Sequence, residues 1–335
     1  MKEKTASLSL LRAIACFGVV LLHCAYACAA PFAESSKEYI AVMGLRNCVM
    51  CSVPVFVMVS GALLLQPERE ISLSKIFKKY VLRMVLTLLV FSLLFYLVDM
   101  YLGVAKKPLD ALLVVYTGEG WSHIWYLYLM IGIYLLLPFY RMIAKNSGSK
   151  ELLYLISVYF VFLCLIPLIN GVTATKAGFY ICTYTVYPLY LFLGYALREK
   201  VLKIKPWLSV LLIALGSALI ILGCRYAYGC NVPALKSLLS SYAFLPVVMQ
   251  AVGVFALADS FRMKEGKLLR FMDGNSFGIY LIHMVFLKYL FVALGLNPMA
   301  NGGMAEVLLL SVAVYLLSAV CTWILRKLPI FRKVL

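Results

Sequence analysis

The 335-residue chain is 64% hydrophobic and only 13% charged, whereas soluble domains carry about 25% charged residues. This composition excludes an ordinary soluble globular protein and leaves no room for a large soluble domain beside the apolar segments. The formal net charge of +17 would suggest a nucleic-acid partner in a soluble protein. Here it falls in basic loops between apolar segments, so we expect a lipid bilayer and no nucleic acid as partner.

Apolar segments of about 20 residues, the length that crosses a bilayer, recur along the whole chain and predict ten transmembrane helices. We expect these spans at 9–30, 45–66, 80–102, 122–140, 151–169, 179–197, 207–227, 238–259, 275–296 and 304–325. Most of the 31 lysines and arginines fall in loops on the same side as the N-terminus. The positive-inside rule then predicts an all-α polytopic membrane protein, one domain over residues 1–335, with both termini in the cytoplasm.

The first predicted span carries an ionisable residue at each end of the stretch RAIACFGVVLLH, Arg12 and His23. Eleven helical steps of about 100° bring both side chains to one helix face, about 16 Å apart along the axis. Ionisable groups at membrane depth are costly, so they normally face a polar pocket inside the bundle. Arg12 could instead be a cytoplasmic anchor and His23 a hydrogen bonder between helices. A cleaved signal peptide is a third alternative for this segment.

The second predicted span contains VFVMVSG, in which Ser60 precedes Gly61, and Pro54 should bend its helix. The glycine permits close approach of a neighbouring helix or a ligand. In the basic loop that follows, apolar residues recur at near-helical spacing over 71–81, which predicts an amphipathic helix on the cytoplasmic surface. Its cations either anchor the protein on anionic lipid or contact a phosphorylated cytoplasmic ligand. The candidate phosphate contacts are Lys75, Lys78, Lys79 and Arg83.

The fourth predicted span begins with WSHIWYL, which places His123 in its first turn. An aromatic belt at the membrane interface explains the tryptophans and the tyrosine but not the histidine. A lone interfacial histidine is often only structural. The functional alternative places His123 and Trp125, with Glu119 of the preceding external loop, at the external mouth of a pocket.

The ninth predicted span opens with DGNSFGIYLIHMVFL, in which Ser276, Tyr280 and His283 share one helix face. His283 lies about 15 Å from the cytoplasmic end of the span, a depth similar to that of His23, so we expect these two histidines to meet. All three histidines of the chain fall in predicted spans. None of the 14 acidic residues is predicted deep in a span, which argues against a buried pair of aspartate and histidine.

The ten cysteines lie mostly in apolar spans, where cysteine behaves as a small hydrophobic residue. Cys48 and Cys51 form a CxxC motif. A zinc site would need two further ligands at suitable spacing, and the sequence offers none. We therefore assign both cysteines to packing and expect no metal.

Five segments in this order resemble the acyltransferase 3 family of membrane acyltransferases, which includes bacterial O-acetyltransferases of cell-surface glycans. The resemblance covers essentially the whole chain, through the pair at 12 and 23, VFVMVSG at 55–61, the basic stretch 78–83, HIWYL at 123–127 and SFGIYLIH at 276–283. Several members carry an extracellular hydrolase-like domain, which this sequence lacks. A similar module precedes a cytoplasmic racemase domain in vancomycin-resistance serine racemases, so the chain could also be the membrane module of a larger protein.

The resemblance implies a multi-pass enzyme of the bacterial plasma membrane. It would move an acyl group, usually acetyl, from cytoplasmic acyl-coenzyme A to an extracytoplasmic hydroxyl, with a cell-surface glycan as the expected acceptor. His23 would act as the general base or form an acyl-imidazole, and Arg12 would hold the coenzyme or polarise the thioester oxygen. Ser60 and the four cations of the basic segment would also bind the coenzyme. The pocket and the acceptor side would be formed by Glu119, His123, Trp125, Ser276, Tyr280 and His283.

A transporter or flippase for a small polar metabolite or a glycan is the main alternative, because it would use the same pocket without chemistry. Secondary transporters are commonly built from internal repeats, and the sequence shows no convincing repeat. Binding of coenzyme A separates the two classes, since a transporter of this kind has no reason to bind it.

Overall fold

The computed structural model describes residues 2–104, 115–118, 120–173, 177–179, 181, 183, 185–261, 263–296, 299 and 303–335, with side chains from residue 6 onward. Within these residues the regular structure is entirely helical. Eight helical segments are long and apolar enough to cross a membrane. The fold is therefore that of a multi-pass membrane protein.

The long segments are formed by single helices or by helices that follow one another with little interruption. They are α1 (Lys2–Ala29), α2 with α3 (Lys37–Cys48, Ser52–Leu64), α4 with η1 and α5 (Leu73–Lys75, Ile76–Val81, Leu82–Tyr101), α7 (Trp125–Asn146), α8 with η2 and α9 (Ser149–Phe160, Val161–Leu165, Ile166–Thr173), α11 (Pro206–Gly229), α14 with η3 (Lys267–Lys288, Tyr289–Ala293) and α16 (Met304–Leu325). The shorter helices are α10 (Tyr187–Arg198), α12 (Pro233–Leu239), α13 (Leu245–Ser260) and α17 (Pro329–Val334).

The prediction of ten spans is confirmed only in part. The segments expected at 179–197 and 238–259 contain α10 and α13, with 12 and 16 residues. At about 1.5 Å per residue these helices are roughly 18 and 24 Å long, less than the ~30 Å of a hydrocarbon core. The count of ten and the cytoplasmic location of both termini remain predictions.

The first predicted loop, at 31–44, is shorter than expected because α2 begins inside it. The side chain of Ser36 accepts a hydrogen bond from the backbone N–H of Tyr39 at 3.1 Å, which caps the helix. The helix stops at Cys48, and α3 resumes at Ser52 with Pro54 in its first turn. The proline lacks the N–H that a continuous helix would need, which fits the interruption between the two helices.

The basic segment predicted to be helical at 71–81 is helical from Leu73 onward and continues into α5. Its apolar side chains do not form one buried face, because Ile76 is buried while Leu73 and Phe77 are 60% and 53% exposed. The π-helical turn η1 shifts the side chains relative to a regular α-helix, so the 3.6-residue period expected from the sequence does not hold there.

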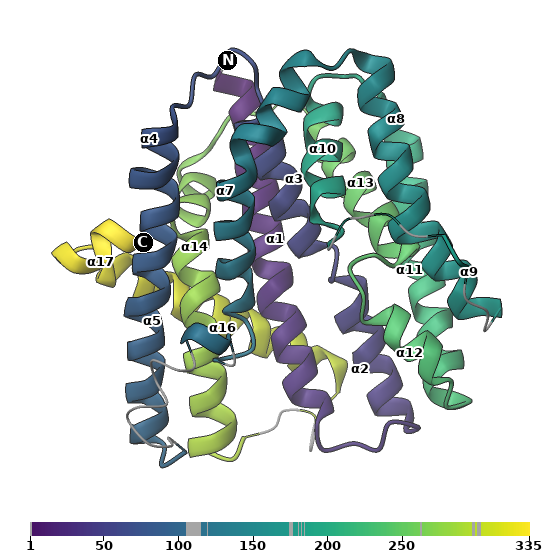
Figure 1. Ribbon diagram of the computed structural model, residues 1–335. Helices are drawn as coiled ribbons and strands as arrows, with labels where there is room; N and C mark the ends of the chain where they lie inside the picture. Colours follow the sequence, from purple (N-terminus) through teal and green to yellow (C-terminus); the bar gives the residue numbers. More distant parts are fainter. Residues whose placement is uncertain are drawn as a thin grey trace.

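The helix α1 lies in the middle of the bundle, with α3 on one side and α14 on the other (Figure 1). It packs against α2, α3, α13, α14 and α16. The apolar window of α1 is 72% buried, compared with 28% for the span that contains α5 and 17% for that of α8 and α9. Residues on α1 are therefore held by protein on several sides, whereas the outer helices leave much of their surface for lipid.

The helices α3 and α10 approach each other backbone to backbone through two glycines. A Cβ on Gly61 would overlap the carbonyl oxygen of Leu191, and one on Gly194 would overlap that of Met58. Small residues permit such contacts between membrane helices. The sequence left open whether Gly61 admits a helix or a ligand, and the structure shows a helix. This contact holds α3, and with it Ser60, against the core.

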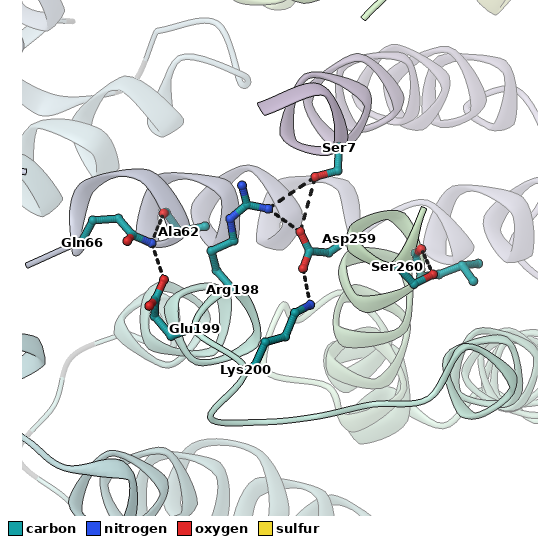
Figure 2. A network of polar contacts seen from close by, with 9 residues as sticks. Ser7, Ala62, Gln66, Arg198, Glu199, Lys200, Asp259 and Ser260 are labelled. Carbon is teal, nitrogen blue, oxygen red and sulfur yellow. Dashed lines mark hydrogen bonds and ion pairs between the residues drawn. The ribbon is translucent and has the colours of Figure 1, made fainter. Parts of the chain in front are cut away.

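A polar network joins the N-terminal part of α1 to the ends of α10 and α13 (Figure 2). The carboxylate of Asp259, whose side chain is 6% exposed, accepts hydrogen bonds from Arg198, from Lys200 at 2.5 Å and from Ser7 at 3.4 Å. Hydrogen bonds to ionised groups are stronger than those between neutral groups. The network therefore ties the two short helices to the central helix.

Candidate functional site

A cavity of about 220 Å³ lies between α1, α3, α5, α7 and α14. Five residues singled out in the sequence line it, namely Arg12, Ser60, Arg83, Ser276 and Tyr280. The rest of the wall is apolar or aromatic. The structure thus brings together residues from four helices that lie up to 268 positions apart in the chain, as expected for a polar pocket inside a bundle.

At the cavity, α1 forms an ion pair with α14 that the sequence did not predict. Arg12 donates from Nε and Nη2 to the two carboxylate oxygens of Asp273, at 2.5 and 2.7 Å. The two side chains are 29% and 14% exposed. The sequence places Asp273 at the very edge of the predicted ninth span, whereas α14 begins six residues earlier, at Lys267. A helix started earlier would have put the carboxylate on the face of Ser276 and Tyr280.

Arg83 is the second cation of the cavity wall. Its guanidinium donates to the carbonyl oxygens of Leu335 at 2.6 Å and Val334 at 3.4 Å, and it lies 5.6 Å from the ring centre of Phe277. No described Asp or Glu side chain forms an ion pair with Arg83. Arg83 therefore adds a second guanidinium to the cavity wall, held by backbone oxygens of the last two residues.

The other basic candidates lie outside the cavity wall. Lys75 is in α4, and Lys78 and Lys79 are exposed in η1. None of the three lines the cavity. A role in binding an anionic ligand would therefore involve the part of the ligand that extends beyond the cavity.

The three histidines form one cluster. The ring centres of His23 and His283 are 5.2 Å apart, those of His123 and His283 5.3 Å, and those of His23 and His123 6.3 Å. The predicted meeting of His23 and His283 is confirmed. His123, which we expected at the external mouth, is instead 1% exposed, because the turn before α7 folds inward and packs this ring against Phe95 and Tyr280.

Backbone carbonyls orient two of the imidazoles. Nε2 of His123 lies 3.1 Å from the carbonyl oxygen of Leu281, and Nδ1 of His283 lies 3.3 Å from that of Ile279. A nitrogen facing a carbonyl must carry the hydrogen, so the other nitrogen of a neutral ring keeps its lone pair. These other nitrogens, Nδ1 of His123 and Nε2 of His283, are buried and have no hydrogen-bond partner among the described residues. Each is therefore available to accept a proton.

No described carboxylate makes a hydrogen bond or ion pair with a histidine in this cluster. In the part of the chain that the structure describes, no three His, Cys, Asp or Glu side chains are arranged to hold a metal ion. The arrangement suits proton transfer between neutral bases.

Tyr280 separates the cavity from the histidine cluster and touches both. It lines the cavity, and its ring centre is 5.6 Å from that of His123 and 6.2 Å from that of His283. Its hydroxyl donates a hydrogen bond to the carbonyl oxygen of His123. Ser276, one turn earlier on α14, lines the cavity as predicted from the spacing.

Trp125 and Glu119, the other two residues predicted on the acceptor side, are not part of the site that the structure describes. Trp125 packs against Tyr187 and Tyr242, with ring centres 5.9 and 5.6 Å away, and does not line the cavity. Glu119 lies outside the described residues.

A second ion pair lies beside the histidine cluster, and the sequence reading gave it no role. Lys288 contacts the carboxylate of Asp99 at 2.5 Å, and the indole N–H of Trp121 donates to the same carboxylate at 2.9 Å. The ring of Trp121 lies 6.2 Å from that of His123. The signal in the sequence was a lysine inside a predicted span, which is unfavourable in lipid unless a partner is near.

One comparison with known proteins identifies the family of this chain. The acyltransferase 3 family model, described as an acyltransferase domain, matches residues 5–324. No curated protein matches the chain significantly, and no solved structure does. The family match includes Arg12, all three histidines and the helices that form the cavity. Because the family model covers nearly the whole chain and the structure has eight helices suited to a membrane, the protein belongs to the acyltransferase 3 family and is a membrane acyltransferase.

Proposed function

We propose that the protein moves an acyl group, acetyl being the simplest, from cytoplasmic acyl-coenzyme A to a hydroxyl of an acceptor outside the cytoplasm, with a cell-surface glycan as the first candidate. The membrane would be the plasma membrane of a bacterium. One observation carries the proposal: α1 presents Arg12 to the cavity and His23 to the histidine cluster, and Tyr280 contacts both regions. A thioester in the cavity would thus lie close to a proton acceptor.

The shape and charge of the cavity support the donor. Its volume of about 220 Å³ is below the ~300–1,000 Å³ of pockets for drug-sized ligands, and most of its wall is apolar. Such a space suits the narrow acylated arm of the coenzyme. The nucleotide would remain outside, where its phosphates would meet the half-buried Lys75 and the exposed Lys78 and Lys79. Arg83, which lines the cavity, would face the ligand's polar groups.

Ser60 supports the same assignment. Its hydroxyl donates to the carbonyl oxygen of Phe56 at 3.0 Å, one turn earlier on α3. The lone pairs of the hydroxyl oxygen remain free to accept a hydrogen bond from an amide N–H. The arm of coenzyme A contains two such amides, so Ser60 would position the arm along the wall of the cavity.

The reaction follows from the two regions. The acceptor hydroxyl oxygen attacks the thioester carbonyl carbon, and neutral His23 takes the hydroxyl proton as the new C–O bond forms. The C–S bond then breaks, and the proton passes from His23 to the departing sulfur, which yields an ester and free coenzyme A. His123 and His283 can exchange the proton with His23 through their unpaired nitrogens. An acyl group carried transiently on His23 gives the same products in two steps.

The first experiment measures thiol release from acetyl-coenzyme A by purified protein, with and without a panel of glycan acceptors. We expect release by the native protein, release at least about 100-fold slower by His23→Ala, and normal release by Tyr26→Ala, which changes an exposed residue of the same helix. The acceptor that accelerates release identifies the substrate.

A second experiment tests donor binding separately from chemistry. We expect coenzyme A to raise the melting temperature of the native protein and of His23→Ala, but not of Arg12→Ala. If coenzyme A neither binds nor reacts, the acyl-coenzyme A proposal is wrong and a transport function has to be tested.

A further inference from the structure

A second cleft, of about 510 Å³, lies between the start of α14 and the end of α16, with α17 beside it. It shares no lining residue with the cavity described above, because it lies on another face of α14. Most of its lining residues are cationic. They are Lys267, Arg270, Arg326, Lys327 and Arg332.

The positive charge of this cleft is largely uncompensated. Only Arg270 has a carboxylate partner among the described residues, Glu265 at 3.2 Å. Arg326 donates to the carbonyl oxygen of Gly274 at 2.6 Å, and Lys327 lies 3.6 Å from the ring centre of Trp323. Neither contact removes charge. Four of the five cations on this concave surface therefore form no ion pair with a described carboxylate, which favours an anionic ligand.

The cleft is bordered by apolar surface that faces away from the bundle. The end of α16 and the turn into α17 expose large side chains next to the cations: Val320 (52%), Trp323 (49%), Ile324 (52%), Leu328 (49%) and Ile330 (66%). On a membrane-spanning helix such side chains contact lipid tails. A ligand that fills the cleft would thus meet cations at one end and an apolar helix face at the other, as an anionic lipid does.

The position of the cleft along the bundle fits a lipid headgroup. Glu265, the partner of Arg270, also accepts a hydrogen bond from Ser9 of α1 at 3.0 Å. The cleft therefore lies at the end of the bundle that holds the first turns of α1, the side predicted to be cytoplasmic. Basic pockets between transmembrane helices on that side bind phosphate-containing headgroups.

We propose that this cleft binds the phosphodiester headgroup of an anionic membrane lipid, with its acyl chains lying along the exposed face of α16. Arg326, Lys327 and Arg332 would contact the phosphate, and Trp323 would lie where headgroup and tails meet. The inference does not depend on the acyl-transfer reaction. It adds a lipid site that borders Gly274, the neighbour of Asp273 in the cavity ion pair.

The first test uses Trp323 as a reporter in the native protein. Protein in neutral detergent is titrated with phosphatidylglycerol or phosphatidylcholine that carries bromine, a fluorescence quencher, on the acyl chains. Trp207 is the matched control, because it is 63% exposed and lies next to the basic residues Lys203 and Lys205. We expect phosphatidylglycerol to quench at lower concentration than phosphatidylcholine, and Trp323→Phe, but not Trp207→Phe, to remove this component. Equal quenching by both lipids would overturn the proposal.

The second test changes charge. Lys267→Gln/Arg332→Gln removes two cations of the cleft, and Lys203→Gln/Lys205→Gln removes two exposed cations elsewhere on the same side. Each cation near an anionic headgroup raises the affinity about fivefold. The first variant should therefore bind phosphatidylglycerol roughly 25-fold more weakly, and the second should bind it normally. Circular dichroism confirms that both are folded. Equal weakening would indicate general attraction to basic loops and would contradict a specific site.

Competition distinguishes the sources of phosphate. Inorganic phosphate and coenzyme A are added separately to protein already quenched by brominated phosphatidylglycerol. We expect neither to restore the Trp323 fluorescence at millimolar concentration, because neither supplies acyl chains for the apolar face. If coenzyme A restores it, the cleft belongs to the donor site and the lipid assignment is wrong.

Discussion

The two regions that α1 connects differ in how their polar side chains are stabilised. At the cavity, Arg12 is matched by Asp273 through two hydrogen bonds of 2.5 and 2.7 Å, and both side chains are partly exposed. In the histidine cluster, His123 and His283 are 1% and 0% exposed and have no described carboxylate partner. The charged pair thus lies where water or a ligand reaches it, and two of the three imidazoles lie where burial would make a charge costly. His23, the third, is half-buried.

This difference suggests a division of roles. A paired, partly exposed arginine suits the binding of an anionic ligand, whereas a buried neutral imidazole suits proton transfer. Changes in the first region should mainly raise KM for the acyl donor, and changes in the second should mainly lower kcat. The following four changes test that division, from the largest expected effect to the smallest.

Replacement of His23 by alanine should have the largest effect. Loss of a general base typically lowers the rate by about 10²- to 10⁴-fold, so we expect kcat to fall by that factor while KM for acetyl-coenzyme A stays unchanged. Steady-state thiol release measures both constants. A variant that raises KM and keeps kcat would place His23 in donor binding and would contradict the division.

Replacement of Asp273 by asparagine should come second. Hydrogen bonds to a charged group contribute about 1.5–3 kcal/mol, so we expect KM for the donor to rise by at least about tenfold, with kcat less affected. Asp273→Glu should restore part of the loss. A double-mutant cycle with Arg12→Ala measures the coupling, and strictly additive effects would show that the two residues act independently.

Removal of the Tyr280 hydroxyl should have a moderate effect on both regions. Tyr280→Phe deletes the hydrogen bond to the carbonyl oxygen of His123, and a neutral hydrogen bond contributes about 0.5–1.5 kcal/mol. We expect a fall of about 1 kcal/mol in the free energy of unfolding and a several-fold decrease in kcat. Tyr126→Phe is the matched control, since Tyr126 also lines the cavity and packs on Tyr280. Equal effects would mean that the hydrogen bond is not responsible.

Neutralising the exposed lysines should have the smallest effect. An exposed ion pair is worth about 0.2–1 kcal/mol. At about 0.5 kcal/mol for each of the two lysines, Lys78→Gln/Lys79→Gln should raise KM for acetyl-coenzyme A by roughly fivefold. The increase should disappear near 1 M salt, where the Debye length is only about 3 Å. Lys203→Gln/Lys205→Gln is the control with the same change in charge. An effect that persists at high salt would indicate direct contacts inside the binding site.

The sequence alone determined those features that depend on periodicity within one helix. The spacing of Arg12 and His23 placed both on one face of α1, and the spacing on α14 aligned Ser276, Tyr280 and His283. Both predictions hold because a helix turns by about 100° per residue whatever its surroundings. Composition likewise predicted a helical membrane protein, since about 20 apolar residues in a row have few other structures available.

The tertiary structure decided which faces meet. Asp273 pairs with Arg12 across 261 positions of sequence, and His123 turns inward to join two histidines from other helices. Neither contact is indicated by the spacing of residues within one helix. They depend on how closely helices approach, as at Gly61 and Leu191, where only the missing side chain of glycine permits contact. A sequence shows that a residue is small but not which helix will fill the space, because partners are selected by packing over the whole bundle.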